Sequence, residues 1–116
     1  MTPATIQDMQ AALAHNTAMV IDIREPHEHA TGVAAGAVLM PIGQIGARLA
    51  EIPKPNAALE NNVVQEVLIV CRTQGRSPPV AMQLVQMGYS NVRYVRGGMS
   101  EWASLGLPMV APQSPQ

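Results

Sequence analysis

One cysteine, two arginines and a serine lie close together in the stretch VLIVCRTQGRSPP. The thiol of Cys71 directly follows an apolar run, and Arg72 and Arg76 flank the short segment that comes next. Nearby cations and the positive end of a helix dipole favour a thiolate over a thiol. Because the thiolate is the nucleophilic form of cysteine, the stretch predicts covalent chemistry at Cys71.

The residues after the cysteine are suited to hold a negative charge. We expect Ser77 to cap a helix that carries Pro78 in its first turn. The loop before this helix keeps free backbone N–H groups, which would form an anion cradle if they curl around the sulfur. The cradle and its substrate-binding rim would consist of Arg72, Thr73, Gln74, Gly75, Arg76 and Ser77.

The simplest alternative is that Cys71 is only a small buried residue at the end of a strand, as many cysteines are. A thiol between arginines, beside the bend expected at Gly75 and at the start of a helix, is poorly placed to be inert. The catalytic interpretation of Cys71 is therefore preferred.

The length of the loop indicates which chemistry it serves. Phosphatases carry a Cys-x5-Arg signature, whose loop wraps a tetrahedral phosphate. Here only four residues separate Cys71 from Arg76. A shorter loop makes a smaller cradle, which favours a persulfide sulfur over a phosphate ester.

The elements that must position the loop follow from apolar runs and from helix start and stop signals. Strands that alternate with helices predict an α/β fold, with a parallel sheet covered on both faces and a site at the carboxyl ends of its strands. Cys71 lies at such an end. Residues 53–62 are predicted to be a surface connection, and the proline-rich residues 108–116 are predicted to fray. Helices are predicted over residues 5–16, 25–32, 43–52, 77–87 and 99–106, and strands over 18–24, 37–42, 63–70 and 91–95. The first helix is predicted to begin at a capping box, with Thr5 as its N-cap and Asp8 three residues later.

The bulk composition limits the function classes. The 116 residues predict a single domain over residues 1–110, followed by a flexible tail over residues 111–116. A net charge of -1 gives no basic field for nucleic acid, and no apolar run is long enough to span a membrane. The N-terminus has no secretory signal pattern, and a single cysteine fits a reducing compartment, so a cytoplasmic location is expected.

The tripeptide His27-Glu28-His29 raises two further possibilities. Two histidines at i and i+2 point to different sides of a helix, and no third ligand lies nearby in the sequence, so a solvated surface helix is preferred over a metal site. A Cys/His/Asp triad of Cys71, one of these histidines and Asp22 is conceivable, but the loop needs no histidine to ionise its cysteine.

Three ordered motifs resemble the single-domain rhodaneses, the thiosulfate sulfurtransferases. The stretch VLIVCRTQGRS resembles their active-site strand and loop, and VIDIREPHEHATGVAAGAVLMPI resembles their opening Asp-x-Arg pattern. The segment GYSNVRYVRGGMSEWASLGLPM is similar to their closing pattern of Gly-Gly and a helix that bears a tryptophan. The resemblance implies a rhodanese-like three-layer α/β fold, with a central, mostly parallel five-stranded sheet and helices on both faces.

The resemblance also implies roles for individual residues. Cys71 matches the sulfur-accepting nucleophile, and the loop after it matches the segment whose amides cradle the persulfide. Asp22 and Arg24 match the pair that supports this loop from beneath. One departure concerns the glycine usually found three residues after the cysteine, because Gln74 stands there and Gly75 follows it.

The implied reaction is a double displacement. A small anionic donor such as thiosulfate would leave its outer sulfur on Cys71 as a persulfide, and cyanide, a thiol or a protein acceptor would remove it. No cofactor is expected apart from this covalent intermediate, and no metal, nucleic acid or membrane partner. Two alternatives stay open: a persulfide carrier or interaction module without turnover, and a phosphatase or arsenate reductase acting on an oxyanion.

Overall fold

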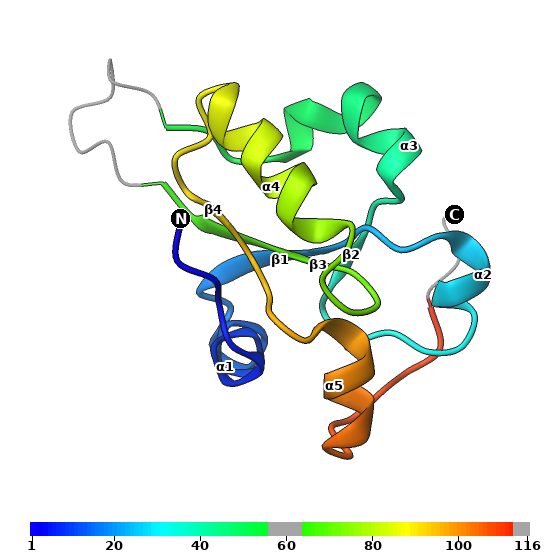
Figure 1. Ribbon diagram of the computed structural model, residues 1–116. Coiled ribbons are helices and arrows are strands. Elements are labelled where there is room, and N and C mark those ends of the chain that lie inside the picture. The colour runs from blue at the N-terminus through cyan, green and yellow to red at the C-terminus, as the bar shows by residue number, and fades with distance from the viewer. Residues whose placement is uncertain (56–63, 113–116) are drawn as a thin grey trace.

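The computed structural model describes residues 1–55 and 64–112. Four parallel strands form its sheet in the order β2-β1-β3-β4. The strands are β1 (Ala18–Asp22), β2 (Val38–Leu39), β3 (Glu66–Val70) and β4 (Val92–Tyr94). The parallel sheet with helices on both faces confirms the predicted architecture (Figure 1).

The implied number of strands is wrong: the described residues form a four-stranded sheet instead of a five-stranded one. The sheet is extended beyond β4 at a single residue, because Ala4 makes an isolated parallel bridge with Val95. Its amide donates to the carbonyl of Tyr94, and its carbonyl accepts from the amide of Arg96, both at 2.8 Å. Helix α1 (Ile6–His15) begins two residues later, which leaves no room for a longer strand.

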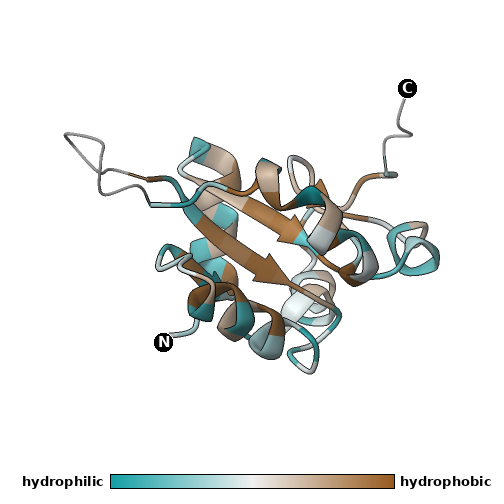
Figure 2. Ribbon diagram, turned by 90° about the horizontal axis from the view of Figure 1, so that it is seen from above, coloured by the Kyte–Doolittle hydropathy of each residue, from teal (hydrophilic) through white to brown (hydrophobic). Residues whose placement is uncertain are grey.

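The alternation of side chains along β3 divides the core into two parts. Leu68 and Val70 face α1 and α5 (Gly98–Ser104), and they pack there with Met9 and Trp102. Val67, Ile69 and Cys71 point to the opposite face, where they pack under α4 (Ser77–Gln86). Figure 2 shows the strands in brown between helices whose colours are mixed, as expected for a sheet that is buried on both faces.

The predicted start of α1 is confirmed in detail. Thr5 and Asp8 form a reciprocal capping box, in which the Asp8 amide donates to Oγ1 of Thr5 at 3.0 Å and the Thr5 amide donates to Oδ2 of Asp8 at 2.9 Å. The helix ends at Asn16, whose backbone is left-handed. These local signals required no knowledge of the rest of the fold.

Other elements are shorter than predicted. The helix α2 covers Pro26–His29 only, and the expected helix over residues 43–52 is divided into α3 (Ile42–Ile45) and a 3-10 segment η1 (Gly46–Glu51). Most of the surface connection expected at residues 53–62 lies outside the described residues, as does the end of the tail from residue 113.

The fraying predicted from residue 108 is wrong for the residues that the structure describes up to Val110. The carbonyl of Pro108 accepts a hydrogen bond of 2.9 Å from the indole of Trp102. The backbone of Val110 forms an antiparallel bridge with Val33 through two hydrogen bonds of 2.8 Å. The chain is therefore tied back to the domain after α5.

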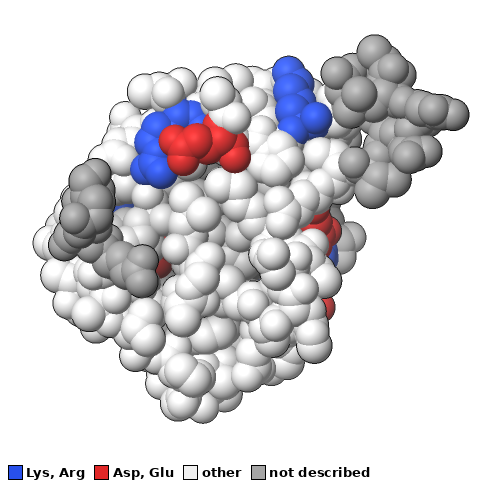
Figure 3. Space-filling view, turned by 180° about the vertical axis from the view of Figure 1, so that it is seen from behind, with Lys and Arg blue, Asp and Glu red and all other residues white. Residues whose placement is uncertain are grey.

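Charged side chains are sparse on the face shown in Figure 3, where blue and red atoms lie side by side over a small area. Among residues 1–55 and 64–112, no helix has the length and apolar character needed to cross a membrane.

Candidate functional site

The carboxyl ends of β1 and β3 lie side by side, because Asp22 pairs in register with Val70. Cys71 follows β3 at this edge, and its residue is only 1% exposed. Its thiol donates a hydrogen bond to the hydroxyl of Ser77 at a distance of 3.4 Å. The structure thus places the predicted nucleophile and the predicted end of its loop in contact.

Ser77 does not cap its helix, which corrects the sequence-based expectation. Arg76 occupies the N-cap position, and Ser77 is the first residue of α4, fully buried, with Pro78 following it. The Ser77 hydroxyl is directed to the sulfur instead of to a backbone amide of the first turn.

The loop between β3 and α4 rests on the start of α5 (Figure 1). The carbonyl of Cys71 accepts from the amide of Met99, and the carbonyl of Arg72 accepts from the amide of Ser100, each at 2.8 Å. These bonds satisfy amides of the first turn of α5 that have no partner within the helix. The contact requires glycine at position 98, because a Cβ there would lie 2.2 Å from the carbonyl oxygen of Thr73.

This docking determines where the loop amides point. In a planar trans peptide, the C=O and the following N–H point in opposite directions. Since the carbonyls of residues 71–73 converge on Gly98, the amides of Arg72, Thr73 and Gln74 point away from α5. The side chain of Cys71 packs on the face of the sheet opposite α5.

The amide cradle is not closed around the sulfur in this structure. Within the described residues, no loop amide donates a hydrogen bond to Sγ, and the thiol is bonded to Ser77 alone. The cradle around the sulfur is therefore not formed for the bare thiol, and it stays a prediction for the persulfide.

The unusual order of Gln74 and Gly75 has a partial structural explanation. The carboxamide oxygen of Gln74 accepts a hydrogen bond of 3.1 Å from the amide of Gly97, in the turn before α5. Gly75 has no positive φ, and a Cβ on it would meet nothing within 4 Å. Gln74 therefore fastens the loop to the neighbouring turn, while neither backbone strain nor crowding requires glycine at position 75.

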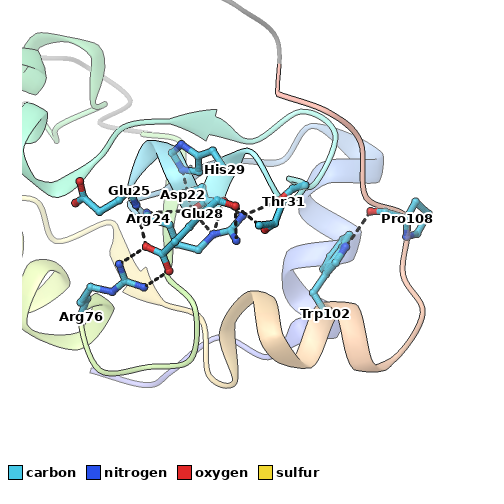
Figure 4. A network of polar contacts seen from close by, with 10 residues as sticks. Asp22, Arg24, Glu25, Glu28, His29, Thr31, Arg76, Trp102 and Pro108 are labelled. Carbon is cyan, nitrogen blue, oxygen red and sulfur yellow. Dashed lines mark hydrogen bonds and ion pairs between the residues drawn. The ribbon is translucent and has the colours of Figure 1, made fainter.

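Arg76 is held from across the site by Glu28 of α2 (Figure 4). The two side chains form a bidentate ion pair with N–O distances of 2.6 and 2.8 Å. Hydrogen bonding from Arg76 is the main cause that lowers the pKa of Glu28 from 4.5 to about 2. The same pair raises the pKa of Arg76, and the nearby Cys71 adds to this in a minor way.

Asp22 and Arg24, which the family resemblance implies as a supporting pair, form a buried ion pair at the end of β1. The Arg24 guanidinium donates to Oδ2 of Asp22 at 2.8 Å, and the Asp22 side chain is completely buried. Arg24 also donates to the carbonyls of Gly32 and Glu28, at 2.9 and 3.4 Å. The pair thus supports α2, and it reaches the thiol loop through Glu28 rather than by a direct hydrogen bond.

The expectation that residues 27–29 form a solvated helix is wrong for His29. Its side chain is buried, with Nε2 3.3 Å from Oδ1 of Asp22 but without the geometry of a hydrogen bond. Within residues 1–55 and 64–112, this nitrogen has no hydrogen-bond partner. His27 is exposed, so the two histidines face different surroundings.

An open cleft of about 390 Å³ lies beside the exposed Arg72. Helix α2 lines it with His27 and Glu28, and α5 lines it with Ser100 and Ala103. Arg72 makes no ion pair within the described part of the chain. A larger hollow of about 1180 Å³, between α2, β2 and residues 33–37, is lined by none of residues 71–77.

Sequence reasoning missed Glu28 and the contact role of Gly98. Glu28 carries a local signal, since it stands three residues after Glu25 and completes a capping box at the start of α2. Its pairing with a residue 48 positions away had no such signal.

Three comparisons bear on the identity of the chain. The "Rhodanese-like domain" family model matches residues 5–105. A sulfurtransferase of Allochromatium vinosum is 39% identical over 82% of this chain and 80% of its own length. Thiosulfate sulfurtransferase 16, chloroplastic, of Arabidopsis thaliana is 31% identical over 78% of each chain.

The fold agrees with these sequence matches. The crystal structure of a rhodanese-related protein from Thermoplasma volcanium superposes with a TM-score of 0.78, at 22% identity, over 97% of this chain and all of that one. The chain therefore belongs to the rhodanese-like domain family.

Proposed function

We propose that the chain is a sulfurtransferase that accepts sulfane sulfur on Cys71 from a donor such as thiosulfate and passes it to a thiophilic acceptor. The observation that carries the proposal is the placement of the one cysteine. It follows β3 directly, contacts Ser77, and is followed by a loop whose carbonyls dock on the start of α5 and whose amides point away from α5.

In the first half-reaction, the thiolate of Cys71 attacks the outer sulfur of the donor. A new sulfur–sulfur bond forms, the donor's own sulfur–sulfur bond breaks, and its electron pair leaves with sulfite. In the second half-reaction, cyanide, a thiol or a protein acceptor attacks the outer persulfide sulfur and releases the Cys71 thiolate. The cycle balances without a redox partner and needs no cofactor beyond the persulfide.

The loop supplies the electrostatics of both steps. The amides of Arg72, Thr73 and Gln74 stabilise the negative charge of the persulfide when it forms. Arg72, whose guanidinium makes no ion pair in the described residues, attracts the anionic donor. Asp22 and Arg24 act at a distance, by holding the helix from which Glu28 reaches Arg76.

The near-complete burial of Cys71 limits the reagents that reach it. A donor that presents one terminal sulfur atom needs less room than a phosphate ester, so the burial supports sulfur transfer. A free thiol that turns over also fits the reducing environment of the cytoplasm, the location we propose.

Intact mass after incubation with thiosulfate tests the proposal. We expect wild type to gain one sulfur atom, to lose it on addition of cyanide, and to release thiocyanate. Cys71→Ser should do neither. Failure of wild type to form the adduct with any sulfane donor, or equal turnover by Cys71→Ser, contradicts the proposal; an adduct that no acceptor removes identifies a persulfide carrier instead.

A further inference from the structure

The bidentate contact between Glu28 and Arg76 balances the charge of one of the two loop arginines. Both terminal nitrogens of the Arg76 guanidinium group donate to Glu28, at 2.6 and 2.8 Å. At any point beyond the pair, the two opposite charges cancel to a dipole, whose potential falls off faster than that of a single charge. Arg76 therefore contributes much less attraction for an anion than its position in the loop suggests.

Other charges at this edge of the sheet are balanced in the same way. Arg24 is paired with Asp22. Glu25, at the start of α2, is close enough to Arg76 to act on it electrostatically. The edge thus combines three guanidinium groups with three carboxylates, namely Arg24, Arg72 and Arg76 with Asp22, Glu25 and Glu28.

Apart from the Cys71 thiolate, the formal charge at the site is therefore close to zero, although its loop contains two arginines. A dianion gains little from such a site and loses much of its hydration when it enters. A singly charged donor loses less hydration, and the charge of Arg72 together with the loop amides is sufficient to attract and stabilise it.

We propose that Glu28 is a specificity-determining residue, which cancels the charge of Arg76 and so makes the site favour singly charged sulfane donors over dianionic ones. The proposal rests on the sulfurtransferase function given above. The favoured donor class comprises organic thiosulfonates and persulfides, which carry the same transferable sulfur as thiosulfate with one negative charge fewer.

The chemistry is the same for both donor classes. With a thiosulfonate, the Cys71 thiolate bonds to the terminal sulfur, the bond between that sulfur and the sulfonyl group breaks, and a sulfinate leaves with the electron pair. With thiosulfate, the leaving group is sulfite. Donor and leaving group each carry one negative charge fewer with the thiosulfonate, and comparison of the ratio between variants removes the difference in intrinsic reactivity of the two donors.

The experiment compares kcat/KM for thiosulfate and for methanethiosulfonate at about pH 8, where ordinary histidines are neutral. Glu28→Gln keeps the side-chain oxygen that accepts from the Glu25 amide at 3.0 Å, so α2 retains its start. We expect this variant to raise the ratio of thiosulfate to methanethiosulfonate activity at least about threefold, because Arg76 then acts as an unbalanced charge. The increase should shrink as salt is added.

Arg76→Gln provides a second variant with the opposite expected sign. It leaves Glu28 as an unbalanced negative charge, so the same ratio should fall at least about threefold. The matched controls are Glu66→Gln and Arg93→Gln. Each breaks a bidentate ion pair with N–O distances of 2.9 and 3.0 Å, and this pair lies at the end of β3 opposite to Cys71. Both controls should leave the ratio unchanged.

A ratio that stays constant or falls in Glu28→Gln overturns the proposal, as does a rise of similar size in Glu66→Gln. The intact-mass adduct separates this failure from that of the proposed function. If wild type forms the persulfide with either donor but Glu28→Gln leaves the activity ratio unchanged, the sulfurtransferase function is retained and only the specificity role of Glu28 is rejected.

Discussion

The thiol of Cys71 and the hydroxyl of Ser77 form a buried hydrogen bond of 3.4 Å at the base of the loop. A hydroxyl both donates and accepts. Ser77 accepts from the thiol in the structure, and it is able to donate to the sulfur once the proton has left. One side chain therefore serves both protonation states of the proposed nucleophile.

Removal of this hydroxyl should impair chemistry more than folding. We expect Ser77→Ala to slow persulfide formation about tenfold, since a hydrogen bond to a charged group contributes about 1.5–3 kcal/mol. The free energy of unfolding should change by less than about 1 kcal/mol, because serine and alanine differ little in volume. Single-turnover mass measurements and urea unfolding test the two parts.

Ser104→Ala is the control for Ser77→Ala. Its hydroxyl donates to the carbonyl of Glu101 on the exposed side of α5. Equal rates of persulfide formation in Ser77→Ala and Ser104→Ala would show that the buried hydroxyl does not assist the sulfur.

Gly98 should tolerate no side chain. In Gly98→Ala, the new Cβ would lie 2.2 Å from the Thr73 oxygen and 2.6 Å from the oxygens of Arg72 and Cys71, at a residue with φ of +64°. We expect a loss of at least about 2 kcal/mol in the free energy of unfolding, together with loss of the persulfide adduct as the loop is pushed off α5.

Gly75→Ala is the matched comparison within the same loop. Its Cβ would meet nothing within 4 Å, and its backbone is not in the left-handed region. We expect its stability to stay within about 0.5 kcal/mol of wild type and its adduct to form normally. A larger loss in Gly75→Ala than in Gly98→Ala would mean that the loop is not docked as described.

Sequence reasoning succeeded where the cause of a feature is local. The capping box of Thr5 and Asp8 and the strand that ends at Val70 both involve neighbours along the chain or a clear apolar run. The family resemblance implied the Asp22–Arg24 pair and a fifth strand, and the fifth strand is absent from the described residues. The four parallel strands were predicted from alternation alone.

Failures concern residues whose partners come from distant segments. Ser77 was expected to cap α4 because a helix start with serine and proline favours it, but the sulfur competes for its hydroxyl. Glu28 and Arg76 are 48 residues apart in the sequence, so their contact follows only from the path of the folded chain and could not be predicted from local patterns. Burial of His29 beside Asp22 depends in the same way on how α2 packs against the end of β1.

The buried pair of Asp22 and Arg24 should be sensitive to removal of one partner. We expect Asp22→Asn to lower the free energy of unfolding by about 3–5 kcal/mol, because it leaves the buried Arg24 guanidinium without a compensating charge. Glu66→Gln removes a carboxylate from an exposed pair and should cost about 0–1 kcal/mol. Similar losses in the two variants, measured by urea unfolding, would argue that Arg24 is solvated.

Acid should weaken the contribution of Glu28 to stability. The pKa of its carboxyl falls from 4.5 to about 2 in the folded protein, mainly through hydrogen bonds from Arg76. A carboxyl with a lowered pKa stabilises the fold fully at pH values above its unfolded pKa, and the contribution is lost as the pH falls toward the folded pKa. The difference in unfolding free energy between wild type and Glu28→Gln should therefore be largest above about pH 5 and should shrink steadily between about pH 4.5 and pH 2.

The test uses the difference in unfolding free energy between wild type and Glu28→Gln. The pKa of Asp8 is also lowered, but the stability that Asp8 loses in acid is the same in both proteins and cancels in the difference. Urea unfolding at about pH 6, 4 and 3 measures it. A difference that stays constant over this range, or that grows toward low pH, would show that the Glu28 carboxylate is not stabilised by Arg76. The charge balance proposed for the donor site would then lose its basis, since it depends on the same ion pair.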